Sequence, residues 1–558
     1  MLAFSSYSVK LFTQEPGLQN FKPHNLRRGN EKAGEPSIKA SLKLRLALYF
    51  LTLMVCDSPA QENPIKIIRS IEITRQDVFP EITGKPAFLY HWANSLHIIT
   101  RERVIRNMLL FKPGEVFDAE LLEESERKLR LLAYLGEAKI FVKNQDADSI
   151  DISVVTQDQW STLVSWILSS GGGRTVLGGA LEEFNLLGLG KRVYNEIKHE
   201  PEGFTYTVRY NDPQVLGSRW TTQETFVTGP FLKFFAAQIV RPFYSLDTRW
   251  AGGVFGDVSA ETIRLFVSGE EVSRLRLESE SAQVLVGRAL GGRFNKIRLQ
   301  LSYRFQTRDF SDFGDLTTTP LPDDELVHTV TSTLSFENVS FVEEKQLDNF
   351  QRTEDITLGN LTAVSIGRSG LPIPKGVRRF EASFRRREAH RFFEKHYIVA
   401  IASLRSLFEK DTIASLRLQY YNKVFRGQTI ALNFEFDYGI DLETSRQFIL
   451  GGDSGLRGYP AREFTGDKRL LLNIEDRIFT PINILTVALG GVLFFDAGTV
   501  WDDSVHLSQL NYSLGLGIRL GYTKSPNSRV GRIDFAWPLH RDGGFGVSIG
   551  VDQQFTLN

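Results

Sequence analysis

The stretch that decides the fold is Leu450–Phe479, which reads LGGDSGLRGYPAREFTGDKRLLLNIEDRIF. Its first half holds four glycines and a proline, a composition that neither a helix nor a regular strand tolerates. Its second half alternates from Leu471 to Ile478, with polar residues on one face and mostly apolar residues on the other. The stretch therefore predicts an irregular loop that leads directly into a β-strand.

A second alternating run follows at residues 493–501, LFFDAGTVW. In two neighbouring strands, this alternation places Glu475 and Asp496 on the same polar face. The glycine-rich part of the preceding loop carries one cation, Arg457. Acids that face a barrel interior need a partner, and a guanidinium is the usual one. We therefore expect Arg457 to pair with Glu475, Asp496 or both.

These residues resemble three motifs of the BamA/TamA-type outer-membrane protein assembly superfamily, the bacterial surface antigen barrels. The loop sequence Leu456-Arg457-Gly458-Tyr459 resembles the VRGF/VRGY motif of that family. Two further motifs resemble its next two barrel strands, in the right order: Asn473-x-Glu475-x-Arg477 and Phe494-x-Asp496-x-Gly498. The resemblance implies that the loop lies inside a barrel.

The first 60 residues have the composition of an extension and a targeting segment. Residues 1–40 are polar and lack a period, which predicts a disordered extension or a mis-assigned start. Residues 41–60 have a basic start, a short apolar run and a small-residue end, and we expect a signal peptide that is cleaved before Gln61. The one cysteine, Cys56, lies in this segment and leaves open a lipoprotein alternative.

Residues 62–157 predict a small α+β domain. A strand at residues 65–74 precedes two helices, the first capped by Thr100 and the second by Asp118, and two strands follow at 139–143 and 149–155. This order, with the turn at residues 111–115, resembles a polypeptide-transport-associated (POTRA) domain. A small α+β domain of another kind remains the alternative.

Residues 158–558 predict a transmembrane β-barrel. Runs of about ten residues place large apolar side chains on one face and polar residues or glycine on the other, as at 297–306, 430–438 and 512–522. At about ten residues per strand plus turns and loops, about 400 residues give room for roughly sixteen strands. Sixteen is also what the resemblance implies. The expected fold class is a membrane β-barrel of about 16 antiparallel strands with one N-terminal periplasmic POTRA-like domain.

The sequence carries no sign of an enzyme. Residues 452–455 spell GDSG, but the histidine and acid patterns of a serine-protease triad are not visible, and the histidines show no metal-ligand spacing. We therefore expect no catalytic residues, cofactor or metal. A formal net charge of zero argues against nucleic acid as a partner.

The resemblance implies a protein of the bacterial outer membrane, with the POTRA domain in the periplasm, that assembles, inserts or translocates other polypeptides. Its expected partners are unfolded outer-membrane or secreted clients, the lipid bilayer and periplasmic accessory proteins. A seam between the first strand, near 160–170, and the last, at 545–555, is expected to open for a client strand. A two-partner-type secretion pore and a passive channel are the alternatives.

Overall fold

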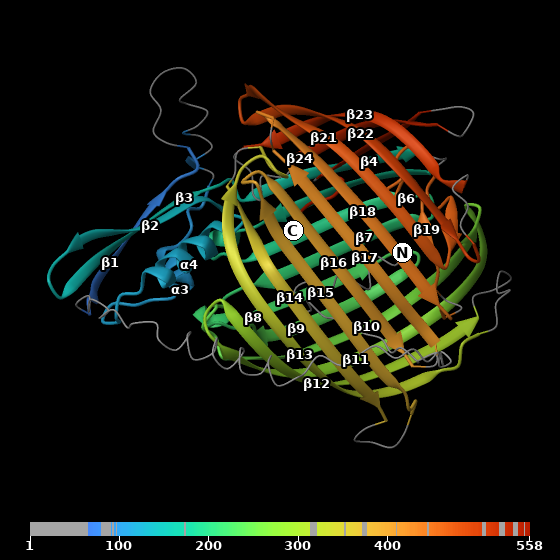
Figure 1. Cartoon of the computed structure of the whole chain (residues 1–558), viewed down its shortest axis with the longest axis horizontal. Helices are drawn as coiled ribbons and strands as arrows, with labels where there is room; N and C mark the ends of the chain where they lie inside the picture. Colours follow the sequence, from blue (N-terminus) through green and yellow to red (C-terminus); the bar gives the residue numbers. More distant parts are fainter. Residues whose placement is uncertain are drawn as a thin grey trace, which may run out of the picture.

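The computed structural model describes residues 65–79, 91, 94–95, 97–171, 174–312, 321–350, 353–370, 376–408, 410–423, 425–443, 446–504, 509–523, 530–539, 545–551 and 553–557. The expected extension and signal peptide, residues 1–60, lie outside these ranges. A small α+β domain lies beside one end of a large antiparallel barrel (Figure 1). In the described part of the chain, no helix is long and apolar enough to cross a bilayer.

The α+β domain has the predicted order of elements. They are β1 (Ile67–Gln76), α3 (Glu102–Met108), α4 (Ala119–Arg130), β2 (Leu135–Gln145) and β3 (Ser149–Asp158). Strand β3 lies in the middle of the sheet, parallel to β1 and antiparallel to β2. The two helices and the sheet bury one apolar core, to which both helices contribute, for example through Ile105 and Leu129.

Of the two predicted helix caps, one is confirmed and one is wrong. Asp118 caps α4, because its Oδ1 accepts from the backbone N–H of Glu120 at 2.9 Å and of Leu121 at 3.4 Å. Thr100 does not cap α3. Its backbone N–H and its hydroxyl both donate to Asp158 Oδ2, at 2.7 and 2.8 Å, so the hydroxyl serves a buried carboxylate instead of a helix end.

The barrel closes through twenty described strands, so the expectation of sixteen is wrong. Several turns between strands are shorter than the estimate of sixteen assumed; only two residues, for example, connect Glu200 to Gly203. More strands therefore fit into the same length of chain. The strands in chain order are β4 (Thr162–Gly171), β5 (Arg174–Glu183), β6 (Arg192–Glu200), β7 (Gly203–Asp212), β8 (Thr221–Thr228), β9 (Leu232–Arg241), β10 (Trp250–Val267), β11 (Glu270–Gly291), β12 (Asn295–Asp312), β13 (Glu325–Glu344), β14 (Glu354–Ser369), β15 (Phe380–Phe392), β16 (His396–Leu407), β17 (Lys410–Asn422), β18 (Gln428–Ile440), β21 (Lys468–Ile484), β22 (Val487–Trp501), β23 (Asn511–Tyr522), β24 (Val530–Pro538) and β25 (Gly546–Val551).

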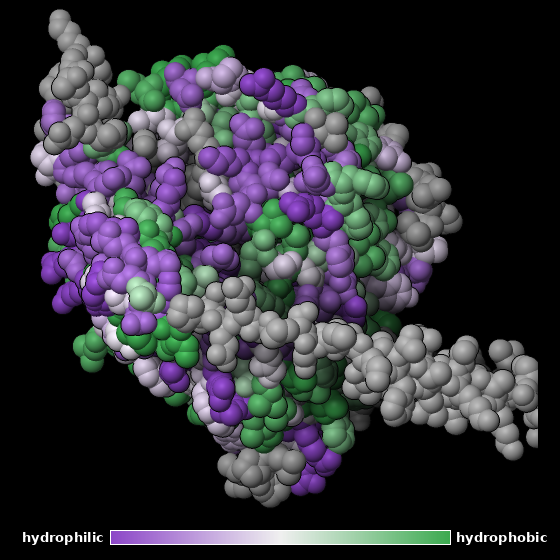
Figure 2. Space-filling view, turned by 60° about the vertical axis from the view of Figure 1, so that its left-hand side comes forward, coloured by the Kyte–Doolittle hydropathy of each residue, from purple (hydrophilic) through white to green (hydrophobic). Residues whose placement is uncertain are grey.

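The alternating runs of the sequence form the two faces of this wall. The predicted runs at 297–306, 430–438 and 512–522 lie in β12, β18 and β23, and their large apolar side chains, such as Leu299 and Leu514, are exposed on the outer face. The opposite face of each strand points into the barrel. Hydrophilic residues predominate over the small domain, whereas hydrophobic patches lie on the flank of the barrel (Figure 2).

The α+β domain is held against one end of the barrel by ion pairs. Arg130 of α4 binds Asp355 at 2.8 Å and Glu343 at 2.6 Å, on either side of the turn between β13 and β14. Arg293, in the turn between β11 and β12, binds Asp118 at 2.7 Å. We call this end of the barrel the domain end.

The last strand is shorter than predicted. It ends at Val551, and residues 553–557, which we call the tail, leave the wall and lie inside the barrel. Phe555 and Leu557 are buried there beside Leu347 of the β13–β14 turn. The expectation of a strand reaching Phe555 is wrong because this turn enters the lumen at the domain end and offers the tail both an apolar surface and hydrogen-bonding groups.

Candidate functional site

The loop predicted from the glycines lies inside the barrel. Two short strands, β19 (Phe448–Leu450) and β20 (Phe464–Gly466), pair at its base, and residues 451–463 form the loop between them. Gly458 has a φ of +90°, which an L-residue with a side chain rarely adopts, and a Cβ there would stand 3.1 Å from Pro538 Cδ. Conformation and close contact with β24 therefore both require glycine at this position.

Apolar contacts fix the two sides of the loop motif. Leu456 and Tyr459 are buried with Leu450 and Leu471, and the Tyr459 hydroxyl donates to the Tyr512 carbonyl at 3.0 Å. Gly498, from the second strand motif, has no side chain and so leaves room for Leu450 at the base of the loop. A Cβ at this position would stand 2.7 Å from a methyl carbon of Leu450.

Arg457 reaches both acids that the sequence places on the polar face. Its Nε and Nη2 donate to the two carboxylate oxygens of Asp496, each at 2.8 Å, and its Nη1 donates to Glu475 Oε1 at 2.9 Å. The guanidinium lies over the ring of Phe494, 3.5 Å from its centroid, and approaches Asp534 at 3.4 Å. Only 2% of Arg457 is exposed. The planar fork of arginine suits this arrangement, because it binds one carboxylate in bidentate fashion and still reaches a second.

Asn473 ties the loop backbone to the same acid. Its Nδ2 donates to Asp496 Oδ1 at 2.7 Å and to the Gly455 carbonyl at 2.9 Å. One buried amide thus satisfies an acceptor on the loop and an acceptor on the wall, which costs less free energy than leaving either group unpaired.

Arg477 continues the charge network toward the domain end. Its Nε donates to Glu475 Oε2 at 2.9 Å, so the two oxygens of Glu475 join Arg457 to Arg477. Its Nη1 donates to Asp348 Oδ1 at 2.7 Å, and its Nη2 donates to the Phe555 carbonyl at 2.7 Å. The loop is therefore connected through side chains to the tail.

The tail is held from several sides. The Leu557 N–H donates to Asp348 Oδ2 at 3.0 Å. Gln553 accepts from Arg519 Nε at 3.0 Å, and Arg519 Nη1 in turn donates to Asp534 at 2.6 Å. We call the connected charged residues the lumen network: Asp348, Arg457, Glu475, Arg477, Asp496, Arg519 and Asp534.

Sequence reasoning placed four of these residues on the motifs and missed Asp348, Arg519 and Asp534 as partners. Arg519 stands on the polar face of a predicted strand, and Asp534 alternates with apolar neighbours, so strand parity was a usable signal for both. Asp348 lies in a turn, where no periodicity indicates which way a side chain points. The lumen network pairs carboxylates with guanidiniums, and these ion pairs hold the loop in place. Among the described residues, no group of side chains could hold a metal ion.

Among the described residues, the seam between the first and last strands has the fewest residue pairs of any two neighbouring strands in the barrel wall. Strand β25 pairs with β4 at two positions, Val547 with Ser170 and Ser548 with Ser169, whereas β4 pairs with β5 at ten positions and β24 with β25 at six. Fewer ladder bonds mean a smaller free-energy cost of separating two strands. Separating β4 from β25 therefore breaks fewer of the described residue pairs than separating β4 from β5 or β24 from β25.

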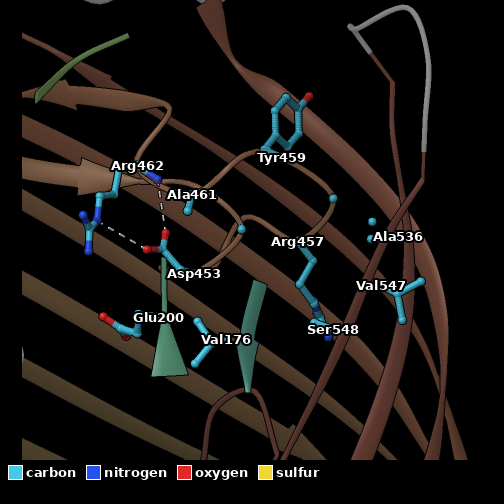
Figure 3. A pocket seen from close by; sticks show the side chains of 13 residues that line it. Val176, Glu200, Asp453, Arg457, Tyr459, Ala461, Arg462, Ala536, Val547 and Ser548 are labelled. Carbon is cyan, nitrogen blue, oxygen red and sulfur yellow. Dashed lines mark hydrogen bonds and ion pairs between the residues drawn. The ribbon is translucent and has the colours of Figure 1, made fainter. Parts of the chain in front are cut away.

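The loop lies directly behind the seam. A Cβ at Gly546 of β25 would stand 2.9 Å from the Cα of Gly458. Between loop and wall remains a cavity of about 150 Å³, lined by Asp453 and Arg462 of the loop and by Val176 and Val547 of the wall (Figure 3). Loop and seam therefore share one site.

Comparison with known proteins fits this architecture. Residues 409–557, which contain the loop and both strand motifs, match the family model of the Omp85 superfamily domain, and this match confirms the predicted resemblance for that part of the chain. No curated protein matches the sequence significantly.

The solved structures that match the chain share little of its sequence. BamA from Haemophilus ducreyi lacking POTRA domains 1–3 matches at 12% identity over 87% of this chain and 83% of that chain, with a TM-score of 0.37. CdiB from Acinetobacter baumannii matches at 12% over 99% and 96%, with a TM-score of 0.43. CdiB from Escherichia coli matches at 11% over 94% and 99%, with a TM-score of 0.35.

Proposed function

Because residues 409–557 carry an Omp85 superfamily domain, we propose that the chain is an outer-membrane β-barrel that assembles, inserts or translocates other polypeptides. In this proposal the client enters at the seam between β4 and β25. The α+β domain is a POTRA domain in the periplasm, so the domain end of the barrel is the periplasmic end.

The observation that carries the proposal is the two-pair seam. A closed barrel has no free edge, whereas a seam that opens offers two edges to an incoming strand. Opening at β4–β25 breaks two residue pairs, and opening at β4–β5 would break ten. A client strand that adds to β4 replaces the lost pairs and continues the ladder beyond Ser169.

The α+β domain offers a second edge for clients. Strand β2 pairs with β3 on one side and forms the outer edge of the three-stranded sheet. Phe141 and Val142 on this strand are exposed. An extended polypeptide in the periplasm gains main-chain hydrogen bonds along such an edge and buries apolar surface against these side chains.

The two alternatives make different demands on the lumen. A secretion pore passes its client through the barrel, so the loop and the tail must both leave the lumen. A passive channel needs permanent space, whereas Arg457 and Arg477 tie the loop, the wall and the tail together. Assembly at the seam requires only that β25 separates from β4.

Depletion of the protein tests the proposal. The assembly function predicts that a set of outer-membrane barrels disappears from the membrane fraction and accumulates in the periplasm. A secretion pore predicts instead that one secreted protein is lost from the medium while the outer-membrane proteome stays constant. A proteome and a secretome that both match the undepleted cells would reject assembly and secretion together.

A further inference from the structure

A polar patch interrupts the apolar outer face of the barrel on strands β14 and β15. Arg386 of β15 forms an ion pair with Glu388 and donates from Nη1 to the Thr362 hydroxyl of β14 at 3.2 Å. His390 Nε2 lies 3.0 Å from Glu388 Oε2. The side chain of Arg386 is still 51% exposed.

Strand register shows that this patch faces outward. Arg386 pairs with Thr362 on β14. Ala382, four residues before Arg386 on the same face of β15, pairs with Ile366, which is 60% exposed. Residues paired across a ladder, and residues two apart along a strand, point to the same side of a sheet. Arg386, Glu388 and His390 therefore lie on the surface that faces lipid in a membrane-spanning barrel.

Arg386 stands at the middle of this surface. Strand β15 begins at Phe380 and ends at Phe392, six residues away in each direction, and both rings are exposed, at 46% and 47%. Exposed aromatic residues mark the two interfaces of an outer-membrane barrel. Six residues of a strand tilted by about 40° span roughly 15 Å along the membrane normal, so Arg386 lies near the bilayer midplane. A cation on the lipid face is most unfavourable at that depth.

We propose that this wall is a contact surface between two copies of the chain in the membrane. The patch carries a cation and an anion two residues apart, so a two-fold axis between two such walls brings Arg386 of each copy to Glu388 of the other. On β16 the neighbours of these residues across the ladder are Ala402 and Ala400, which leave the wall flat and allow a second wall to approach closely. The contact removes the charges from lipid.

The position of the patch on the barrel has a consequence for function. Counted from β4, strands β14 and β15 are the eleventh and twelfth of twenty, so the patch lies opposite the seam. Two copies that meet at this wall keep both seams turned away from the contact and open to clients. The inference rests on the barrel spanning a membrane, as in the proposed function, and it does not depend on the client.

Thiol crosslinking in native membranes tests the contact. The chain has one cysteine, so a Cys56→Ser background removes it. Ala402→Cys on the patch should give a species of twice the monomer mass with a short bismaleimide. Ala282→Cys, on the outer face of β11 away from the patch, is the matched control and should give at least tenfold less. A product whose mass shows a different protein instead of a second copy would overturn the proposal.

Charge reversal separates the ion pairs from simple proximity. Arg386→Glu should lower the crosslinked fraction at least tenfold, because each wall then presents two acids. Arg386→Glu combined with Glu388→Arg should restore it to within twofold. Arg386→Met with Glu388→Met keeps the wall apolar and should fold as a monomer. Heat-modifiable migration on a gel checks folding of every variant.

The outcomes distinguish this inference from the proposed function. Membrane-embedded wild-type protein that stays monomeric, or a single reversal that crosslinks as well as wild type, would overturn the dimer and leave the assembly function intact. Chain recovered without detergent from the soluble fraction would overturn both.

Discussion

At the scale of the single residue, the position of the loop depends on Arg457. Its guanidinium binds two buried carboxylates from two strands. Removing it leaves Asp496 with the neutral amide of Asn473 and leaves Glu475 with Arg477. Breaking a buried ion pair by deleting one member costs about 3–5 kcal/mol. A water-filled lumen would screen this loss, but 2% exposure leaves little room for screening. We expect Arg457→Ala to release the loop and lower client assembly at least tenfold, measured by the amount of folded client in the membrane.

The conservative variant separates charge from geometry. Arg457→Lys keeps the cation but cannot bind Asp496 with two donors and still reach Glu475, so it should restore activity only in part. Proteolysis of intact cells, directed at residues 451–463, reports whether the loop has left the lumen. Protection of the loop in Arg457→Ala equal to that in wild type would contradict this prediction.

At the scale of the element, the seam has a defined register that a crosslink can lock. Ser169 and Ser548 pair across β4 and β25. Leu163, by contrast, lies near the start of β4 and packs against the core of the α+β domain, so it does not face Ile549 of β25. We expect the double variant Ser169→Cys, Ser548→Cys to form a disulfide under oxidation and to abolish client assembly, while the barrel stays folded.

The same variant supplies its own control. Reduction of the disulfide should restore assembly to the level of either single-cysteine variant, measured in the same membranes. Full activity of the oxidised, quantitatively crosslinked protein would show that clients do not use the seam and would favour passage through the lumen.

The tail is the second element with a separable role. Its Phe555 carbonyl and Leu557 N–H bind Arg477 and Asp348, and its apolar side chains fill space at the domain end. Deletion of residues 553–558 should therefore widen the lumen and raise single-channel conductance in planar bilayers at least twofold. Phe555→Ala, which keeps the backbone bonds, should have a smaller effect. An unchanged conductance in the deletion variant would mean that the tail does not obstruct the lumen.

At the scale of the whole molecule, the joint between domain and barrel contains a titratable group. Asp158, at the end of β3, accepts two hydrogen bonds from Thr100, and the Thr100 hydroxyl accepts one from Asn185 of the barrel turn at 2.9 Å. Burial raises the pKa of Asp158 from 3.8 to about 6, against the opposing effect of these bonds and of nearby His97. Asp77 also faces the group through its contact with His97 at 3.1 Å.

The raised pKa of Asp158 fixes the direction in which folding stability changes with pH. Between pH 3.8 and about 6 the folded protein binds more protons at Asp158 than the unfolded chain does, so stability falls as pH rises through this window. The effect is at most about 3 kcal/mol. We expect the melting temperature of the protein in detergent to be higher at pH 5 than at pH 7.5. Asp158→Asn, which retains an acceptor for Thr100, should reduce this difference. A variant with the same pH profile as wild type would assign the effect to another group.

The sequence by itself determined the loop, the alternating strands and the face on which Glu475 and Asp496 lie. Glycine and proline exclude regular structure locally, and a period of two fixes which side of a strand a residue occupies, so Glu475 and Asp496 could be placed without coordinates. The order of elements in the α+β domain and the cap at Asp118 follow from equally local rules.

Only the tertiary structure decided how many strands close the barrel, where the last one ends and what the charges bind. Closure depends on the lengths of all connections together, which no single segment encodes. Thr100 serves Asp158 instead of its helix, because a carboxylate 58 residues away is buried beside it. Asp348 and the tail meet Arg477 inside the lumen across more than 70 residues of sequence. Such contacts arise from chain closure, and alternation along one strand carries no information about them.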